Sequence, residues 1–531
     1  MKCGVDFRRL SPLYRTPAYD QTPVFLDVAS AEAGNPLYVE LAASHGGSLL
    51  FHNLGVFAQD TWRVLPALTV TYGVRWDVDF APNSSPGLLA VTGFDLTNLS
   101  NLALAPAGTP PFHTTYGNVA PRLGLAYEIS HSQKWQTLLH AGFGSFFDLA
   151  TSEIGNGLFF ANYPFGATQF VFGSFPLNST AGAPPSITTA ALASGNLTAL
   201  DPNLELPYTL QWNVAFEQAL GTEQTVSASY VGAAGKRLLQ TAEINAPNPR
   251  FAVADLVSNA ATSNYNALQI QFQRRLSHGL QVLASFTWSH SIDTASAGSL
   301  YGDYANALTP GINPNANRGS SDFDVRDGFS SGLTYDVPVP KVSRPLEAIV
   351  RAWSVQSVIQ ARSSSPVNIY SSSLSFATPI FTAIRPDVVP GVPLYLDGSQ
   401  FPGNKAFNPA AFTPPPIDPS SGVPLRQGTL PRNALQGFSA AQWDFAVHRN
   451  FAIHESLGLE FRAEIFNILN HPNFGPPVGN LGASQFGQST QMLGQYLSGG
   501  TLGANTGGGA FSPLYQIGGP RSIQLALKLR F

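Results

Sequence analysis

The sequence predicts an all-β protein that forms a transmembrane antiparallel up-and-down β-barrel. Three observations predict this fold. Charged residues are few, many segments alternate apolar with polar residues, and the connections alternate between short turns and long loops along the chain. A soluble β-repeat or β-propeller would share some of these features and is the alternative fold.

The composition indicates an outer surface that is not covered by charge. Charged residues make up 11% of the 531 residues, against roughly a quarter in soluble globular proteins, while hydrophobic residues reach 44%. The 49 glycines, 42 prolines and 11% aromatic residues suit a fold with many strands and many connections. The net charge of −4 provides no basic field, so we expect no nucleic-acid partner.

Cysteine content and hydropathy limit how the chain can be held together. Cys3 is the only cysteine, which excludes an intramolecular disulfide and a zinc site built from cysteines. A transmembrane helix needs a run of about 18 apolar residues, and the sequence has none. A membrane-spanning form of this chain must therefore be a barrel.

The last segment of the chain shows the strand pattern most clearly. One face carries apolar side chains, which are Ile523, Leu525, Leu527, Leu529 and Phe531. The opposite face carries Ser522, Gln524, Ala526, Lys528 and Arg530. A soluble sheet would turn the apolar face inward, whereas a membrane barrel turns it toward lipid and the polar face toward a wet lumen.

A row of glutamines favours the membrane barrel. Gln269, Gln271 and Gln273 alternate with apolar residues and share one face of a predicted strand. Buried in a soluble core, each amide would cost roughly 1–3 kcal/mol if unpaired, and water in a lumen removes that cost.

About fourteen strands follow an alternating pattern of apolar and polar residues, and most of them are near the 9–11 residues of a tilted membrane strand. Tyr and Trp near their ends are expected to form interface girdles.

The connections between the strands alternate in length. Short turns are expected at residues 65–67, 131–133, 221–222, 277–279 and 452–454. Long loops rich in Gly, Pro, Ser and Asn are expected at about 81–117, 149–207, 294–321, 364–442 and 472–518. Outer-membrane barrels have tight periplasmic turns and long extracellular loops, so this order places the C-terminus on the periplasmic side.

Several short segments match a known pattern in the same order along the chain. They are residues 55–63 (GVFAQDTWR), 72–77 (YGVRWD), 120–127 (APRLGLAY), 207–213 (PYTLQWN), 229–232 (SYVG), 265–269 (YNALQ), 285–289 (SFTWS), 322–326 (DFDVR), 461–467 (FRAEIFN) and 470–475 (NHPNFG). Together they resemble the Oar-like TonB-dependent outer-membrane receptors and transporters of Gram-negative bacteria. The resemblance runs from Val5 to Phe531 and covers the C-terminal β-barrel portion of that family.

The resemblance implies one β-barrel over residues 1–531 that is incomplete at its N-terminal side. Transporter barrels of this type have about 22 strands. Relatives carry a signal peptide, a carboxypeptidase-regulatory-like domain and a plug before the barrel. The residues after Met1 contain no signal-like apolar stretch, so we expect these parts to precede the chain. Asp327 is a local departure, because relatives tend to have His at that position.

The resemblance also implies a location in the cell outer membrane and an uptake function. The expected role is the binding and import of a bulky nutrient, with an oligosaccharide or a peptide ahead of an iron chelate. The implied partners are outer-membrane lipid, the barrel-insertion machinery, an extracellular ligand, and the TonB complex acting through the missing plug. Two alternatives stay open: a passive porin-like or fatty-acid-type channel, and an adhesion or surface-structural protein.

Two sets of residues are candidate sites. Phe531, Leu529 and Leu527 form the terminal alternating pattern and are expected to act as the barrel-assembly signal. A second set gathers aromatic residues in one long loop and could offer a stacking surface to a ligand. Its members are Phe159, Phe160, Tyr163 and Phe165, followed by Phe170 and Phe172. The alternative for this second set is that the loop packs on itself.

Other constellations favour structural roles. Residues 232–237 (GAAGKR) lack the spacing and the Ser or Thr of a phosphate-binding loop, and we interpret them as a turn.

Asp322, Asp324 and Asp327 could bind a cation or a sugar, but loop salt bridges are the preferred interpretation. His448, His454 and His471 have no metal-binding spacing, and Glu460, Arg462 and Glu464 are expected to form lumenal ion pairs. We therefore expect no enzyme activity, no cofactor and no metal site.

Overall fold

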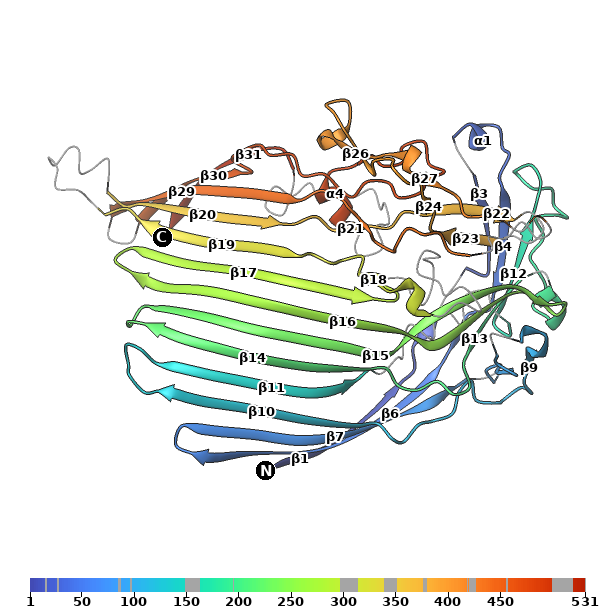
Figure 1. Cartoon of the computed structure of the whole chain (residues 1–531), viewed down its shortest axis with the longest axis horizontal. Helices are drawn as coiled ribbons and strands as arrows, with labels where there is room; N and C mark the ends of the chain where they lie inside the picture. Colours follow the sequence, from blue (N-terminus) through green and yellow to red (C-terminus); the bar gives the residue numbers. More distant parts are fainter. Residues whose placement is uncertain are drawn as a thin grey trace.

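A single large curved sheet dominates the computed structural model of the chain, and smaller elements gather at one end of its strands (Figure 1). The model describes residues 1–531 except residues 15–16, 26–27, 85–86, 96–97, 149–162, 194, 297–313, 339–350, 376–379, 418, 420–425, 455–456, 499–518 and 531.

The large sheet has 16 strands, and two of them, β13 (Asn196–Leu200) and β18 (Gly319–Ser320), lie off its main path. The remaining fourteen strands follow chain order, each antiparallel to its neighbours. They are β1 (Lys2–Leu10), β6 (Leu50–Leu65), β7 (Leu68–Asn83), β10 (Val119–Ser130), β11 (Thr137–Phe147), β14 (Tyr208–Leu220), β15 (Gln224–Asn248), β16 (Phe251–Ser277), β17 (Leu280–Asp293), β19 (Asp327–Asp336), β20 (Trp353–Arg362), β29 (Ala440–His454), β30 (Leu457–Phe466) and β31 (Ser522–Arg530). This is the up-and-down order that the alternating sequence predicts. Within the described residues β1 and β31 do not pair with each other.

The two faces of the sheet differ as expected for a membrane wall. Apolar side chains are exposed on the outer face of strand after strand, as with Leu527, which is 71% exposed on β31. The exposed aromatic residues Trp62 and Trp135 lie near the short turns, and Tyr116 and Trp288 lie toward the long loops. The inner face carries mainly hydroxyl, amide and charged side chains. The outward apolar face predicted from the sequence is therefore present.

The β15–β16 hairpin is much longer than the membrane requires. Its strands have 25 and 27 residues, against about 9–11 for a tilted membrane strand. The ladder continues past the wall on the long-loop side, where β13 pairs with β16 in parallel (Figure 1). Register shifts between Gly235 and Gln240 mark the point where the hairpin leaves the regular ladder.

The described parts of the long connections contain small sheets. A three-stranded sheet joins β3 (Tyr19–Val24), β4 (Tyr38–Ser44) and β12 (Gly166–Val171). Two-stranded sheets pair β2 (Leu13–Tyr14) with β5 (Gly47–Ser48), β8 (Val91–Thr92) with β9 (Ala103–Leu104), β21 (Pro366–Val367) with β28 (Leu435–Gln436), β22 (Ser371–Ser375) with β23 (Ile380–Ile384), β24 (Asp387–Val388) with β27 (Phe412–Thr413), and β25 (Tyr395–Asp397) with β26 (Lys405–Phe407).

Helices are short and lie in the connections. They are α1 (Val28–Glu32), α4 (Leu493–Ser498) and the 3₁₀ turns η1 (Leu99–Asn101), η2 (Thr189–Ala193), η4 (Pro314–Asn317), η5 (Pro402–Asn404) and η6 (Pro409–Ala411). None of the helices in the described segments is long and apolar enough to cross a membrane.

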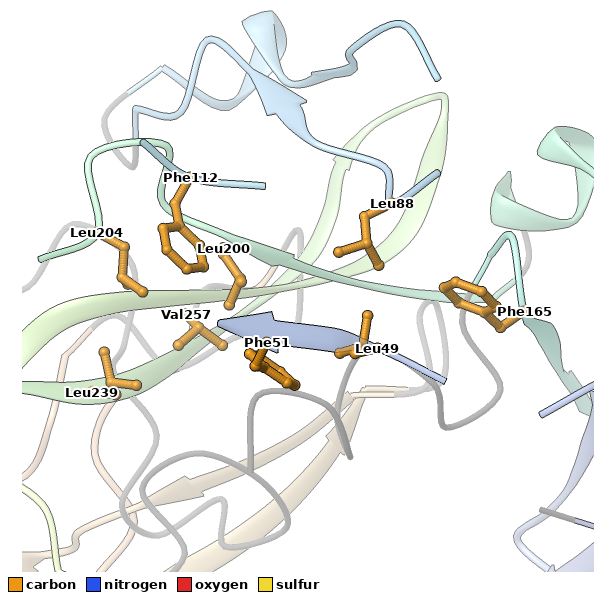
Figure 2. Close-up of a cluster of buried hydrophobic side chains, with 9 residues drawn as sticks. All are labelled: Leu49, Phe51, Leu88, Phe112, Phe165, Leu200, Leu204, Leu239 and Val257. Atoms are coloured by element: carbon orange, nitrogen blue, oxygen red, sulfur yellow. The ribbon is translucent and has the colours of Figure 1, made fainter. Parts of the chain in front are cut away.

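The folded segments at the long-loop end of the wall form a packed cap. Apolar clusters hold these segments together. Figure 2 shows one cluster, which joins Leu49 and Phe51 to Phe165 and Val257 from distant parts of the chain. A second cluster surrounds Ile244 and Leu256 of the long hairpin. A third surrounds Phe407 and Leu435 in the connection between β20 and β29. The cap therefore has cores of its own, and these include residues of the extended strands β6, β15 and β16.

The two faces of the wall should respond differently to a charge. In Phe286→Arg a cation replaces an exposed outer-face side chain in the middle of β17. We expect a loss of about 2–4 kcal/mol in folding free energy in a bilayer, because lipid cannot solvate the charge. In the matched control Ser285→Arg the same charge faces the inner side, and stability should change little. Urea unfolding in lipid vesicles measures both, and equal losses would contradict the assignment of faces.

Candidate functional site

The inner face of the wall holds a large cavity. Its volume is about 640 Å³, and it spans strands β6 to β16. The inward side chains that line it are mostly neutral hydrogen-bonding groups, among them Gln59, Thr71, Gln211, Asn213, Ser229 and Gln269. The lining residues that the structure describes include one cation, Arg122, and no carboxylate.

Arg122 is held in place by an aromatic ring. Its guanidinium carbon lies 4.4 Å from the centroid of the Phe146 ring, a favourable cation–π arrangement. Gly144 makes this contact possible, because a Cβ at that position would lie 2.8 Å from the same ring. The charged group is thereby oriented on β10, and none of the residues that the structure describes forms an ion pair with it.

A second cavity lies farther along the same face, on β17, β19, β20 and β29. Its volume is about 310 Å³. Ser285, Thr287, Ser330 and Gln360 line it together with Arg362, the last residue of β20. Its described lining repeats the character of the first cavity: hydroxyls, amides and one arginine.

Two other arginines of the inner face, Arg75 and Arg462, form ion pairs. The Arg75 Nε lies 2.8 Å from Asp77 Oδ1, and its Nη2 lies 3.5 Å from Asp6 Oδ2. On β30, Arg462 Nη2 lies 2.7 Å from Glu464 Oε1, which confirms the lumenal ion pairing predicted for this segment. These pairs stabilise the wall and give no indication of ligand binding.

A buried arginine ties the cap to the wall. Arg432, in the connection between β20 and β29, is 0% exposed, and its Nη1 lies 2.5 Å from Oδ1 of Asp293 at the end of β17. Its Nη2 lies 3.1 Å from Asp322 Oδ1 and donates to Ser296 Oγ at 2.6 Å. Breaking a buried ion pair would leave an uncompensated charge, so the contact is costly to open. It therefore constrains the position of the β20–β29 connection relative to the β17–β19 connection.

A neighbouring arginine is buried with neutral partners. Arg385 donates from Nε to the carbonyl of Leu430 and from Nη1 to Asn317 Oδ1. Burial, with a further contribution from the nearby charge of Arg432, lowers the pKa of Arg385 to about 10. The side chain stays protonated at neutral pH and adds a second link between the same connections.

Asp322 and Asp324, two of the three acidic residues singled out in the sequence, serve as structural partners. Asp322 accepts a hydrogen bond from Asn433 in addition to its contact with Arg432. The buried Asp324 lies 3.0 Å from His290 Nδ1 and accepts a hydrogen bond from the Ser291 backbone N–H. This pattern agrees with the preferred interpretation of loop salt bridges. In the described segments no group of three or more His, Cys, Asp or Glu residues is arranged to hold a metal ion.

The predicted assembly residues lie at the edge of the wall. Leu527 and Leu529 are 71% and 45% exposed on the outer face of β31, as their alternation requires. Phe531 lies outside the described residues. The structure therefore places two of the three side chains of the expected signal.

The predicted aromatic loop surface is only partly described. Phe159 and Phe160 lie outside the described residues. Phe165 is 4% exposed within the cluster of Figure 2, and Tyr163 packs against a second apolar cluster. Phe170 meets Tyr38 edge to face at 5.4 Å, whereas Phe172 is exposed. For Phe165 and Tyr163 this packing favours the alternative that the loop packs on itself.

Sequence reasoning did not single out Arg122, Arg362 or Arg432. The first two occupy polar positions of alternating strands, which is a weak signal shared by many inner-face residues. Arg432 lies in a long connection, and no local pattern indicates its partner Asp293, which is 139 residues away.

The apolar outer face, the polar inner face and the up-and-down antiparallel order define an outer-membrane β-barrel. The chain belongs to the outer membrane beta barrel domain family, whose model matches residues 1–497. Its location is accordingly the cell outer membrane, and the predicted fold class is confirmed. No curated protein matches the chain.

Solved structures with a similar fold are outer-membrane transporters and receptors. The chain is similar to the outer membrane transporter YddB from Escherichia coli, with 11% identity, 99% of this chain and 54% of that chain covered, and a TM-score of 0.49. It is also similar to the ferric-catecholate import receptor Fiu from E. coli K12, with 8% identity, 99% and 54% coverage, and a TM-score of 0.42. The chain spans about half the length of these proteins, 54% in each case.

The buried Arg432 pair should matter more than an exposed pair in the same connection. Arg432→Ala leaves Asp293 buried without its cation, and we expect about 3–5 kcal/mol less protection against local opening. Backbone amides of residues 319–324 and 426–436 should exchange their hydrogens faster in the variant. The amides of β10 and β11 should remain as protected as before.

The matched control is Arg426→Ala. Arg426 forms two hydrogen bonds with Asp387 at 2.7 and 2.8 Å, and these bonds hold the pKa of that carboxyl below its usual value. Because Arg426 is exposed, its loss should cost less than about 1 kcal/mol. Equal effects of the two substitutions would contradict the role assigned to Arg432.

Proposed function

We propose that the chain is the barrel of a TonB-dependent receptor that binds and imports a bulky nutrient. An oligosaccharide or a peptide suits the site better than an iron chelate. The observation that carries this proposal is the inner wall, where cavities of about 640 and 310 Å³ present amides, hydroxyls and single arginines. Such groups recognise organic ligands rich in hydrogen-bonding atoms. The segments that resemble Oar-like receptors support the same role.

The proposed role assigns a partner to each surface. The apolar outer face contacts lipid, and the cap meets the extracellular ligand. The TonB complex acts through a plug held inside the wall, and the barrel-insertion machinery reads the last strand. We propose no enzymatic step, because binding and energised passage need no covalent chemistry.

Uptake measurements in the native Gram-negative host test the proposal. Deleting the gene should abolish growth on at least one member of a panel of oligosaccharides and peptides supplied as sole carbon source. Deleting TonB should have the same effect, while growth on an iron chelate as iron source should be unchanged by loss of this gene. Uptake that requires this protein but persists without TonB would establish the passive channel instead.

We also propose that Phe531, Leu529 and Leu527 form the assembly signal. Deleting Phe531 should reduce the amount of folded protein in the outer membrane, because the insertion machinery would lose the terminal aromatic ring. Heat-modifiable migration on gels measures the folded fraction, and Phe531→Tyr is the control that keeps a ring at that position. Undiminished insertion of the deletion variant would overturn this role.

A further inference from the structure

We propose that the two inner-wall cavities form one continuous track that binds an acidic oligosaccharide, with Arg122 and Arg362 each holding a carboxylate. This inference deepens the proposed function and rests on it, because it names the class of nutrient that the wall recognises. It concerns the inner face of the wall, where one described residue of the cap, Asn473, also lines the second cavity.

The cavities meet on neighbouring strands. Ser229 and Gln269 line the first cavity and are paired in register on β15 and β16. Gln269 is in turn paired with Thr287 of β17, which lines the second cavity. One row of side chains therefore runs from one cavity into the other, across adjacent strands and on the same face.

The length of the track suits an extended ligand. Arg122 lies on β10 and Arg362 on β20, and the path between them crosses seven strand-to-strand steps. At about 4.8 Å a step, the two strands are separated by roughly 34 Å along the curved wall. A single small molecule cannot reach both arginines, whereas a chain of several sugar residues can.

The charge pattern favours an acidic ligand. Among the residues described, neither cavity is lined by an Asp or Glu, and each contains one arginine. Neither arginine forms an ion pair within the described segments, whereas Arg75 and Arg462 on the same face do. The two cations therefore remain available for carboxylates of a ligand, with which a guanidinium forms paired hydrogen bonds.

The remaining lining groups favour a sugar over a polypeptide. Gln211, Asn213 and Gln269 can each donate to and accept from a hydroxyl, and Ser285 and Thr287 add hydroxyls of their own. A peptide that binds in extended form pairs with the backbone of an open strand edge. Here the strands of the track are interior strands with neighbours on both sides, so only their side chains face the lumen.

Binding measurements on the purified full-length protein test this inference without requiring TonB. The probes are a hexamer of galacturonic acid and a neutral glucose hexamer, both followed by isothermal titration calorimetry. We expect the acidic hexamer to bind more tightly and its affinity to fall as salt is added. Arg122→Gln and Arg362→Gln should each weaken its binding roughly tenfold, the loss of one charge-assisted contact.

The controls separate charge from folding and from the wider proposal. Arg462→Gln removes an inner-face arginine outside both cavities and should leave the affinity unchanged. Arg122→Lys keeps the positive charge and should retain part of the affinity. This retained binding would show that the site is folded in the variant. Equal affinity for both hexamers, binding of the acidic hexamer unaffected by both Arg→Gln changes, or tighter binding of a glutamate peptide would each overturn the inference. TonB-dependent growth on another nutrient, together with any of these results, would leave the proposed function intact.

Discussion

Backbone hydrogen bonding in lipid is the constraint on which this structure depends. The hydrocarbon core offers no water to unpaired N–H and C=O groups, so each membrane strand must find its partners in adjacent strands. The unbroken ladder from β1 to β31 meets this requirement with neighbours in chain order. Once the ladder is set, alternate side chains must face lipid and lumen. The apolar outer surface and the polar cavities are therefore two results of one pairing pattern.

The wall was largely predictable from the sequence because its pattern is local. Alternation over about ten residues identifies a strand and both of its faces, as with Ile523 to Leu529, and the fourteen strands of the main path agree with the number expected. The β15–β16 extension was missed because residues 232–237 were interpreted as a turn, and this prediction was wrong: they continue as strand within β15. The cap was also missed, because its cores join residues as distant as Leu49 and Val257.

The candidate sites were less predictable for the same reason. Arg122 and Arg362 share a face only because seven pairings connect their strands, and nothing near either residue indicates the other. Arg432 is similar: its burial is tolerable only because Asp293, Ser296 and Asp322 arrive from another connection. The sequence could indicate that Arg122 and Arg362 occupy polar positions of their strands, but not that their charges would remain unpaired.

The long hairpin determines how the cap is carried. Its two strands share one ladder from the short turn at residues 221–223 to the tip at Pro249 and Arg250, and the cores around Ile244 and Val257 pack against its outer part. A force that pulls the tip away from the membrane acts on many of the hydrogen bonds between β15 and β16 at the same time. The hairpin is therefore stiff along its length. Register shifts between Gly235 and Gln240, and again between Asn245 and Asn248, interrupt this regular ladder. Bending of the hairpin is therefore expected at these irregular places, and the first of them lies where the hairpin leaves the regular ladder of the wall.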